Sequence, residues 1–273
     1  MIGAMGLPFL ALFFFLSIGC AITLFPYFNV DIFKKGRPLK LRGWLSALLL
    51  MLVAVGCALL TLSLVRTSAP DLIDKVFAFV FSAGWAANAL FLLPRFFNRT
   101  RIPISVASGV VIFAVVWMWP VTGLVNVFYA GSIVWIGPVI FRRFKLPLRY
   151  FIIGLALFLL YDILNIFALN TGTVVTQETG KFSGLVTFDG NELGIGDFFI
   201  AYVMANAFQY FFRSQKLAWL LAALFALPLL LLTIIPLLSG AIIPYTIFLI
   251  PVAFVAYSVA VRKNIRQQNR GVG

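Results

Sequence analysis

Long apolar runs recur from one end of this chain to the other, and they constrain its fold more than any other feature. Hydrophobic residues make up 63% of the 273 residues, and the mean hydropathy is +1.07. A helix needs about 20 mostly apolar residues to cross a bilayer, and backbone polar groups in lipid must be satisfied within the protein. Because the runs exceed the roughly 10-residue strands of a membrane barrel, we predict an all-α polytopic protein embedded in a lipid bilayer.

Proline, glycine and charged residues divide the runs into nine predicted membrane-spanning helices, which form a single transmembrane domain over residues 1–273. The predicted spans cover residues 6–28, 43–66, 71–94, 103–119, 121–141, 148–169, 193–213, 217–237 and 240–261. Cys20 and Cys57 fall inside spans, where we expect buried small hydrophobic side chains. The sequence contains no His and no close Cys pair, and it predicts neither a metal site nor a cofactor.

The net charge of +13 reflects topology better than nucleic-acid binding, because the basic residues lie in short clusters between apolar runs. Of the 21 Lys and Arg residues, 18 follow odd-numbered spans or lie in the C-terminal tail, and only Arg66, Lys75 and Lys181 fall on the other side. Basic residues accumulate in cytoplasmic loops. The distribution therefore predicts an amino terminus outside, a carboxyl terminus in the cytoplasm and no nucleic-acid partner.

Two of the eight acidic residues, Asp162 and Asp197, lie inside predicted spans, whereas Asp71 and Asp74 lie at the outer boundary of the third span. Asp162 interrupts the apolar stretch "LFLLYDILNIF" (158–168), and Asp197 follows two glycines in "LGIGDFF" (193–199). A charge at bilayer depth costs at least about 2.5 kcal/mol, so each acid needs a partner or a function. The two acids belong to consecutive antiparallel spans, at about 10 Å and about 6 Å from the outer ends at 1.5 Å per residue. The similar depths predict that they form a pair.

Two carboxyl groups that share a site hold one proton between them, which suits simultaneous acid and base chemistry. The ionised member takes a proton from water as the water attacks a carbonyl group, and the protonated member donates to the developing oxyanion. This is the mechanism of an aspartic protease. Gly194 and Gly196 lack a Cβ atom, which would let backbone and substrate approach each other closely.

With Tyr161-Asp162 in the sixth span and Gly194-Ile195-Gly196-Asp197 opening the seventh, the chain resembles the presenilin and signal peptide peptidase family of intramembrane GxGD aspartyl proteases. The resemblance implies a presenilin-like arrangement of nine helices, with catalytic Asp162 and Asp197 and with Tyr161 beside the site. The third family motif, Pro-Ala-Leu, reads Pro244-Tyr245-Thr246 here, and these residues would help to place substrate. The implied substrates are transmembrane-helix peptides, and the predicted orientation is similar to that of signal peptide peptidases.

The outer loop between the sixth and seventh spans contains two stretches rich in Val, Thr and Phe, "GTVVTQ" (172–177) and "GLVTFDG" (184–190). They predict two short strands, a β-hairpin whose free edge would pair with an unwound substrate segment. Asn88, Asn126, Asn165 and Asn206 lie in spans, where asparagines form hydrogen bonds between helices. Asn165 lies three residues after Asp162 and would face the same side of its helix.

Two alternatives stay open from the sequence. A proton-coupled transporter would use the paired acids as a proton relay, and it would carry internal repeats and broken helices. A prepilin-type peptidase shares the GxGD pattern but places its first acid near a cytoplasmic loop. The sequence does not determine the substrate, the cleavage register or the need for partner subunits, and it is compatible with a homo-oligomer.

Overall fold

The computed structural model describes residues 6–29, 70–93, 100–143, 146–167, 185–189, 191–232, 249–255 and 257–258. This part of the chain is mostly helical, with one small two-stranded sheet. The long helices are α1 (Gly6–Leu24), α3 (Pro70–Leu92), α4 (Arg101–Met118), α7 (Leu148–Phe167), α9 (Ile195–Phe212) and α10 (Gln215–Leu232). The shorter helical elements are η2 (Phe25–Tyr27), α5 (Thr122–Ser132), α6 (Ile136–Pro138) and the π-helix η5 (Val139–Arg143). The strands are β1 (Leu185–Phe188) and β2 (Asn191–Gly194).

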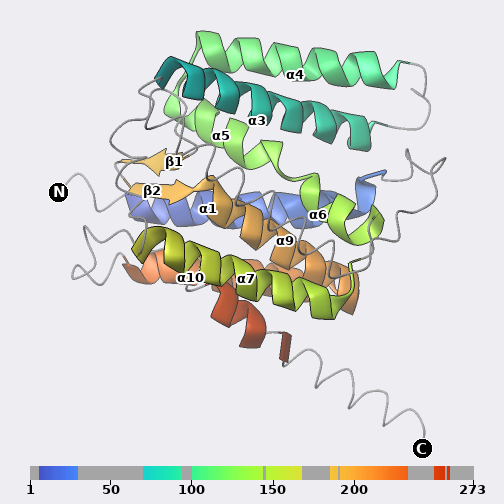
Figure 1. Ribbon diagram of the computed structural model, residues 1–273, viewed down its shortest axis with the longest axis vertical. Coiled ribbons are helices and arrows are strands. Elements are labelled where there is room, and N and C mark those ends of the chain that lie inside the picture. Colours follow the sequence, from blue (N-terminus) through green and yellow to red (C-terminus); the bar gives the residue numbers. More distant parts are fainter. Residues whose placement is uncertain are drawn as a thin grey trace, which may run out of the picture.

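The helices run side by side as a bundle, with the hairpin at one end and α6 toward the other (Figure 1). On one flank α4 packs on α3, and α3 packs on α5. On the other flank α10 packs on both α1 and α9. In the middle, α1 contacts α9 and both strands, and α5 contacts β1. The hairpin is therefore held within the bundle by α1 and α5.

Four helical segments of the described residues are long and apolar enough to cross a membrane. They are Gly6–Tyr27, Asp74–Leu92, Arg101–Met118 and Thr122–Arg142, and shorter apolar helical stretches cover Leu148–Leu160 and Gln215–Leu230. The outer surface of α4 is apolar, and five of its side chains are 55–67% exposed: Ile102, Val106, Val110, Val111 and Met118. An apolar surface of this kind suits contact with lipid. The chain therefore has the character of a polytopic membrane protein.

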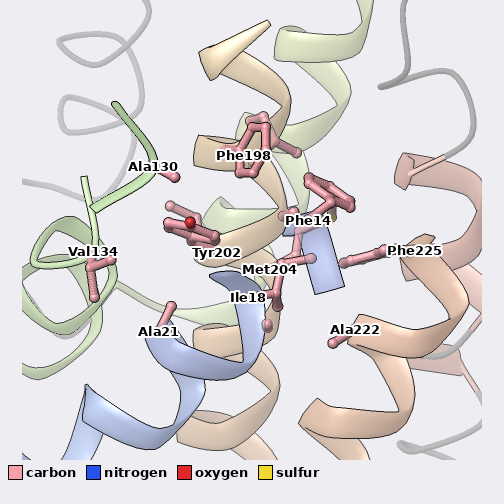
Figure 2. Packing of buried hydrophobic residues seen from close by; sticks show 14 of the residues in the cluster. Phe14, Ile18, Ala21, Ala130, Val134, Phe198, Tyr202, Met204, Ala222 and Phe225 are labelled. Atoms are coloured by element: carbon pink, nitrogen blue, oxygen red, sulfur yellow. The ribbon is translucent and has the colours of Figure 1, made fainter. Parts of the chain in front are cut away.

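The core is rich in aromatic side chains at the junction of α1, α9 and α10 (Figure 2). Phe14 of α1 packs edge-on against Phe198 of α9, with 4.8 Å between the ring centroids, and Phe225 of α10 lies on its other side. All three rings are fully buried. Because lipid tails are as apolar as these side chains, close packing and dispersion hold the helices together more than exclusion of water does.

Small residues allow the helices to approach one another closely. A Cβ atom at Gly19 of α1 would lie 2.1 Å from the indole ring of Trp219 on α10, and one at Gly84 of α3 would lie 2.5 Å from the backbone carbonyl oxygen of Ser132 on α5. At Gly84 the backbone leaves no room for a side chain, and at Gly19 a side chain would force the Trp219 ring to move. Glycine at these positions therefore allows the close helix packing that is common in membrane proteins.

The C-terminal ends of α1, α3 and the fifth predicted span meet at one end of the bundle. The N–H group of Asn29 donates to the carbonyl oxygen of Phe91 at 2.7 Å. The guanidinium group of Arg142 donates to the carbonyl oxygens of Phe25 (3.1 Å), Pro26 (3.1 Å) and Phe28 (2.7 Å). Three odd-numbered predicted spans thus run in the same direction, as alternating crossings require.

The observed helices coincide with most of the predicted spans within a few residues. The predicted span 43–66 lies outside the described residues, and of span 240–261 only the helical residues 249–255 and 257–258 are described, so the count of nine stays a prediction. The seventh span begins at Ile195 instead of residue 193, because Leu193 and Gly194 belong to β2. Cys20 was expected to be buried, which is wrong, since its side chain is exposed on α1.

The fifth span is interrupted, whereas a continuous helix over 121–141 was predicted. α5 ends at Ser132, a turn covers residues 133–135, and α6 leads directly into the π-helix η5. Pro138 has no N–H group to continue the ladder. Side chains of α3 satisfy carbonyl groups near the break: Trp85 donates to Phe128 at 2.9 Å, and Asn88 donates to Gly131 at 2.8 Å. For Asn88 the predicted bond between helices is therefore confirmed.

Candidate active site

Asp197 lies where a strand becomes a helix. β2 ends at Gly194, α9 begins at Ile195, and Asp197 is the third residue of that helix and its only acidic residue in the first turn. The Asp197 side chain is half-buried. The N-terminal end of a helix carries a partial positive charge, which favours a negative charge on a carboxyl group in the first turn.

The two glycines beside Asp197 differ in their surroundings. A Cβ atom at Gly194 would lie 3.4 Å from Oδ2 of Asp197, an ordinary contact that shows the carboxyl group next to the end of β2. A Cβ atom at Gly196 would meet no described atom within 4 Å, and Gly196 is exposed. The packing of the described residues therefore does not require glycine at position 196, and none of them occupies the space beside its backbone.

The other residues predicted for the site cannot be placed against Asp197. Asp162 and Tyr161 belong to α7, but their side chains lie outside the described residues, as does that of Asn165. The Pro244-Tyr245-Thr246 segment also lies outside them. The pairing of Asp162 with Asp197 and the role of the third motif stay predictions.

A β-hairpin leads directly into the Asp197 turn, and it differs from the predicted one. β1 lies within the predicted strand at 184–190, and it pairs antiparallel with β2, which the sequence analysis assigned to a loop and to the start of the seventh span. The predicted strand at 172–177 lies outside the described residues. The register pairs Leu185 with Gly194 and Phe188 with Asn191.

One face of the hairpin is anchored on α1. Val186 and Leu193, which lie opposite each other in the ladder, are both buried. On the same face, the ring of Phe188 lies 5.4 Å from that of Phe13, centroid to centroid, and Phe13 lies 5.9 Å from Phe198. The aromatic chain joins the hairpin, α1 and the residue that follows Asp197, so it fixes the hairpin relative to this acid.

A second contact of the hairpin is polar and joins β1 to Asn126 of α5, whose side chain is only 1% exposed. Its side-chain amide donates to the carbonyl oxygen of Thr187 at 2.8 Å and accepts from the N–H group of Thr187 at 3.0 Å. The sequence predicted a bond between helices here, but Asn126 bonds to a strand. Nothing in the sequence distinguishes Asn126 from the other asparagines in spans.

Two further buried polar residues differ from their predictions: Asp74, and Asn206, for which the expected bond between helices is not found among the described residues. Asp74 of α3 is 8% exposed, although the sequence placed it at the outer boundary. Asn206 of α9 is fully buried beside Gly137, and neither polar atom of its side chain has a hydrogen-bond partner among the described residues. Within the same part of the chain, no group of three or more acidic, Cys or His side chains is arranged to hold a metal ion.

Comparison with known proteins adds no assignment. No protein-family model matches the chain, and a search of curated proteins found no significant match. The case for a function therefore depends on the residues and their geometry.

Proposed function

We propose that this protein is an intramembrane aspartyl protease, an aspartic endopeptidase that hydrolyses peptide bonds within transmembrane helices of its substrates. The observation that carries the proposal is the continuity of β2 with the helical turn that holds Asp197. A strand beside a carboxyl group is the arrangement that an extended peptide needs for backbone pairing and hydrolysis.

The outer edge of β2, where the described residues place no third strand, supports this proposal. In an antiparallel ladder, successive residues turn their backbone groups alternately toward the partner strand and away from it. Thr187 bonds to Asn126 on its outer side, so Thr187 and Glu192 form a non-hydrogen-bonded pair. The backbone groups of Glu192 and the N–H group of Gly194 then face the outer edge of β2, where the described part of the chain adds no third strand.

The position of Asp197 favours the role of general base for this acid and of general acid for Asp162. The dipole of α9 favours the ionised form of Asp197 in its first turn, whereas Asp162 lies outside the first and the last turn of α7. In the proposed reaction Asp197 takes a proton from water, and the water oxygen bonds to the carbonyl carbon. Asp162 donates its proton to the developing oxyanion. In the collapse of the intermediate the C–N bond breaks, the departing nitrogen takes the proton that Asp197 holds, and a hydroxyl group of the intermediate returns a proton to Asp162.

A proton-coupled transporter is the second candidate, and the interrupted fifth span is the observation that favours it. Broken helices beside buried polar side chains form ion sites in many transporters, and Asn206 lies against Gly137 at this break. The two functions differ in their products. A protease releases peptide fragments, whereas a transporter moves protons and leaves peptides intact.

One experiment separates the two proposals. The full chain is reconstituted in liposomes that contain a single-span peptide and an internal pH indicator, and fragments are identified by mass spectrometry. We expect fragments cut within the apolar segment and no proton flux above that of empty liposomes. Proton flux with an intact peptide panel would contradict the protease proposal and favour the transporter.

A further inference from the structure

The side chain of Asn126 occupies the outer edge of β1 as a neighbouring strand would. Its amide makes both bonds that a strand residue makes, one to the N–H group of Thr187 and one to the carbonyl group. Asn126 belongs to α5 and is almost completely buried, so the amide cannot move aside without disturbing the contact between α5 and β1. The backbone of Thr187 is therefore unavailable to another chain.

The two edges of the hairpin thus differ. The outer edge of β1 is closed at Thr187, whereas the exposed Glu192 on β2 turns its backbone groups toward an edge with no further strand in the described part of the chain. Neighbouring strands lie about 4.8 Å apart, so a peptide added to β1 would lie about 14 Å from one added to β2. Only the peptide on β2 would lie beside the strand that continues into the Asp197 turn.

We propose that Asn126 is a positioning residue that closes the β1 edge and directs an incoming substrate strand to β2. The inference rests on the proposed proteolysis, and it names the residue that determines which edge of the hairpin binds the substrate. Asn126 does not touch the reacting atoms. It acts through the hairpin, by leaving β2 as the edge on which, among the described residues, an extended peptide can pair.

The test measures edge choice directly, by cross-linking in liposomes. The full chain carries Cys20→Ala, Cys57→Ala and Asp162→Asn, which removes the native thiols and keeps the peptide uncut. A single cysteine is then introduced by Glu192→Cys on β2 or Leu185→Cys on β1, and a single-span peptide with one cysteine is added. We expect cross-links predominantly at position 192.

The Asn126→Leu substitution fills a similar volume without polar atoms, and it should raise cross-linking at position 185. We expect an increase of about five- to tenfold, because the net free energy of about one hydrogen bond changes an equilibrium constant by that factor. The cross-link at position 192 should persist. Asn88→Leu is the matched control, because Asn88 is also a buried asparagine that bonds to a backbone carbonyl group, but one of α5 instead of the hairpin. It should leave the ratio of the two cross-links unchanged.

The outcomes separate this inference from the proposed function. Equal cross-linking at both edges without any substitution, or an unchanged ratio in Asn126→Leu, would overturn the edge-closing role alone. Loss of both cross-links in Asn126→Leu would show general collapse of the hairpin and would also contradict that role. A peptide that cross-links at neither edge in any variant would contradict strand addition itself, and with it the proposed substrate-binding mode.

Discussion

The space beside the Gly196 backbone is not occupied by any described atom, which allows a quantitative prediction about substrate approach. If a substrate backbone lies against Gly196, the methyl group of Gly196→Ala would displace it by about 1 Å or more, because heavy atoms pack at about 3.5–4 Å. A misplacement of about 1 Å can lower the rate about 100-fold, equivalent to about 2.7 kcal/mol of transition-state stabilisation. We therefore expect kcat/KM for peptide cleavage to fall about 100-fold.

The same substitution should not harm the fold. Gly196 has no positive φ, its Cβ position is open among the described atoms, and it is the second residue of α9. Alanine favours a helix over glycine by up to about 1 kcal/mol, so the thermal midpoint should stay constant or rise by about 2–4 °C. Activity and stability should thus change in opposite directions.

Gly123 provides a matched control for this experiment. It is the second residue of α5, it is exposed, and a Cβ atom there would also meet no described atom within 4 Å. Gly123→Ala should match the stability change of Gly196→Ala and cleave at the unmodified rate. Cleavage by Gly196→Ala within about threefold of the unmodified chain, at about 0.7 kcal/mol or less, would refute the proposed approach of substrate at this position.

Two predictions concern stability. Arg142→Gln should lower the free energy of unfolding by about 1–2 kcal/mol, because three carbonyl groups just after α1 lose a charged donor. Arg149 is the control, since its exposed guanidinium group contacts only the Tyr150 ring among the interactions described, at 4.6 Å from the ring centroid. Arg149→Gln should cost less than about 1 kcal/mol. Reversible unfolding in mixed detergent measures both, and equal costs would be inconsistent with the Arg142 contacts. Gly137→Ala should cost about 1–3 kcal/mol, because its Cβ would lie 2.2 Å from Nδ2 of Asn206, and adding Asn206→Ala should recover at least half of that loss. A double variant as unstable as Gly137→Ala alone would disprove the clash.

Hydropathy predicted the helical regions because the bilayer sets one dominant rule for a spanning segment, its length in apolar residues. It did not predict the interruption after Ser132, because the residues around the break are as apolar as those of a continuous helix. The break depends on donors for nearby backbone carbonyl groups, and the side chains of Trp85 and Asn88 supply these donors from a different helix. Such tertiary donors cannot be identified in one sequence.

The second strand escaped prediction because Asn191-Glu192-Leu193-Gly194 is polar and lacks β-branched residues. A turn signal was present, since Asp189-Gly190 is a preferred dipeptide of two-residue hairpin loops, and Asp189 has a φ of 47°. That signal, read together with the predicted strand just before it, would have located the hairpin turn. The role of Asn126 depends on contact between residues 61 positions apart, which no local pattern contains.

The central claim is that Asp162 and Asp197 act as one catalytic pair, and cleavage of a single-span peptide by separate Asp162→Asn and Asp197→Asn variants tests it most directly. Asp189→Asn is the control, because Asp189 is an exposed acid on the same hairpin with a positive φ that asparagine tolerates. We expect the unmodified chain and Asp189→Asn to cut within the apolar segment, and each of the other two variants to leave the peptide intact. Cleavage that survives either Asp162→Asn or Asp197→Asn would contradict a catalytic pair of these two acids.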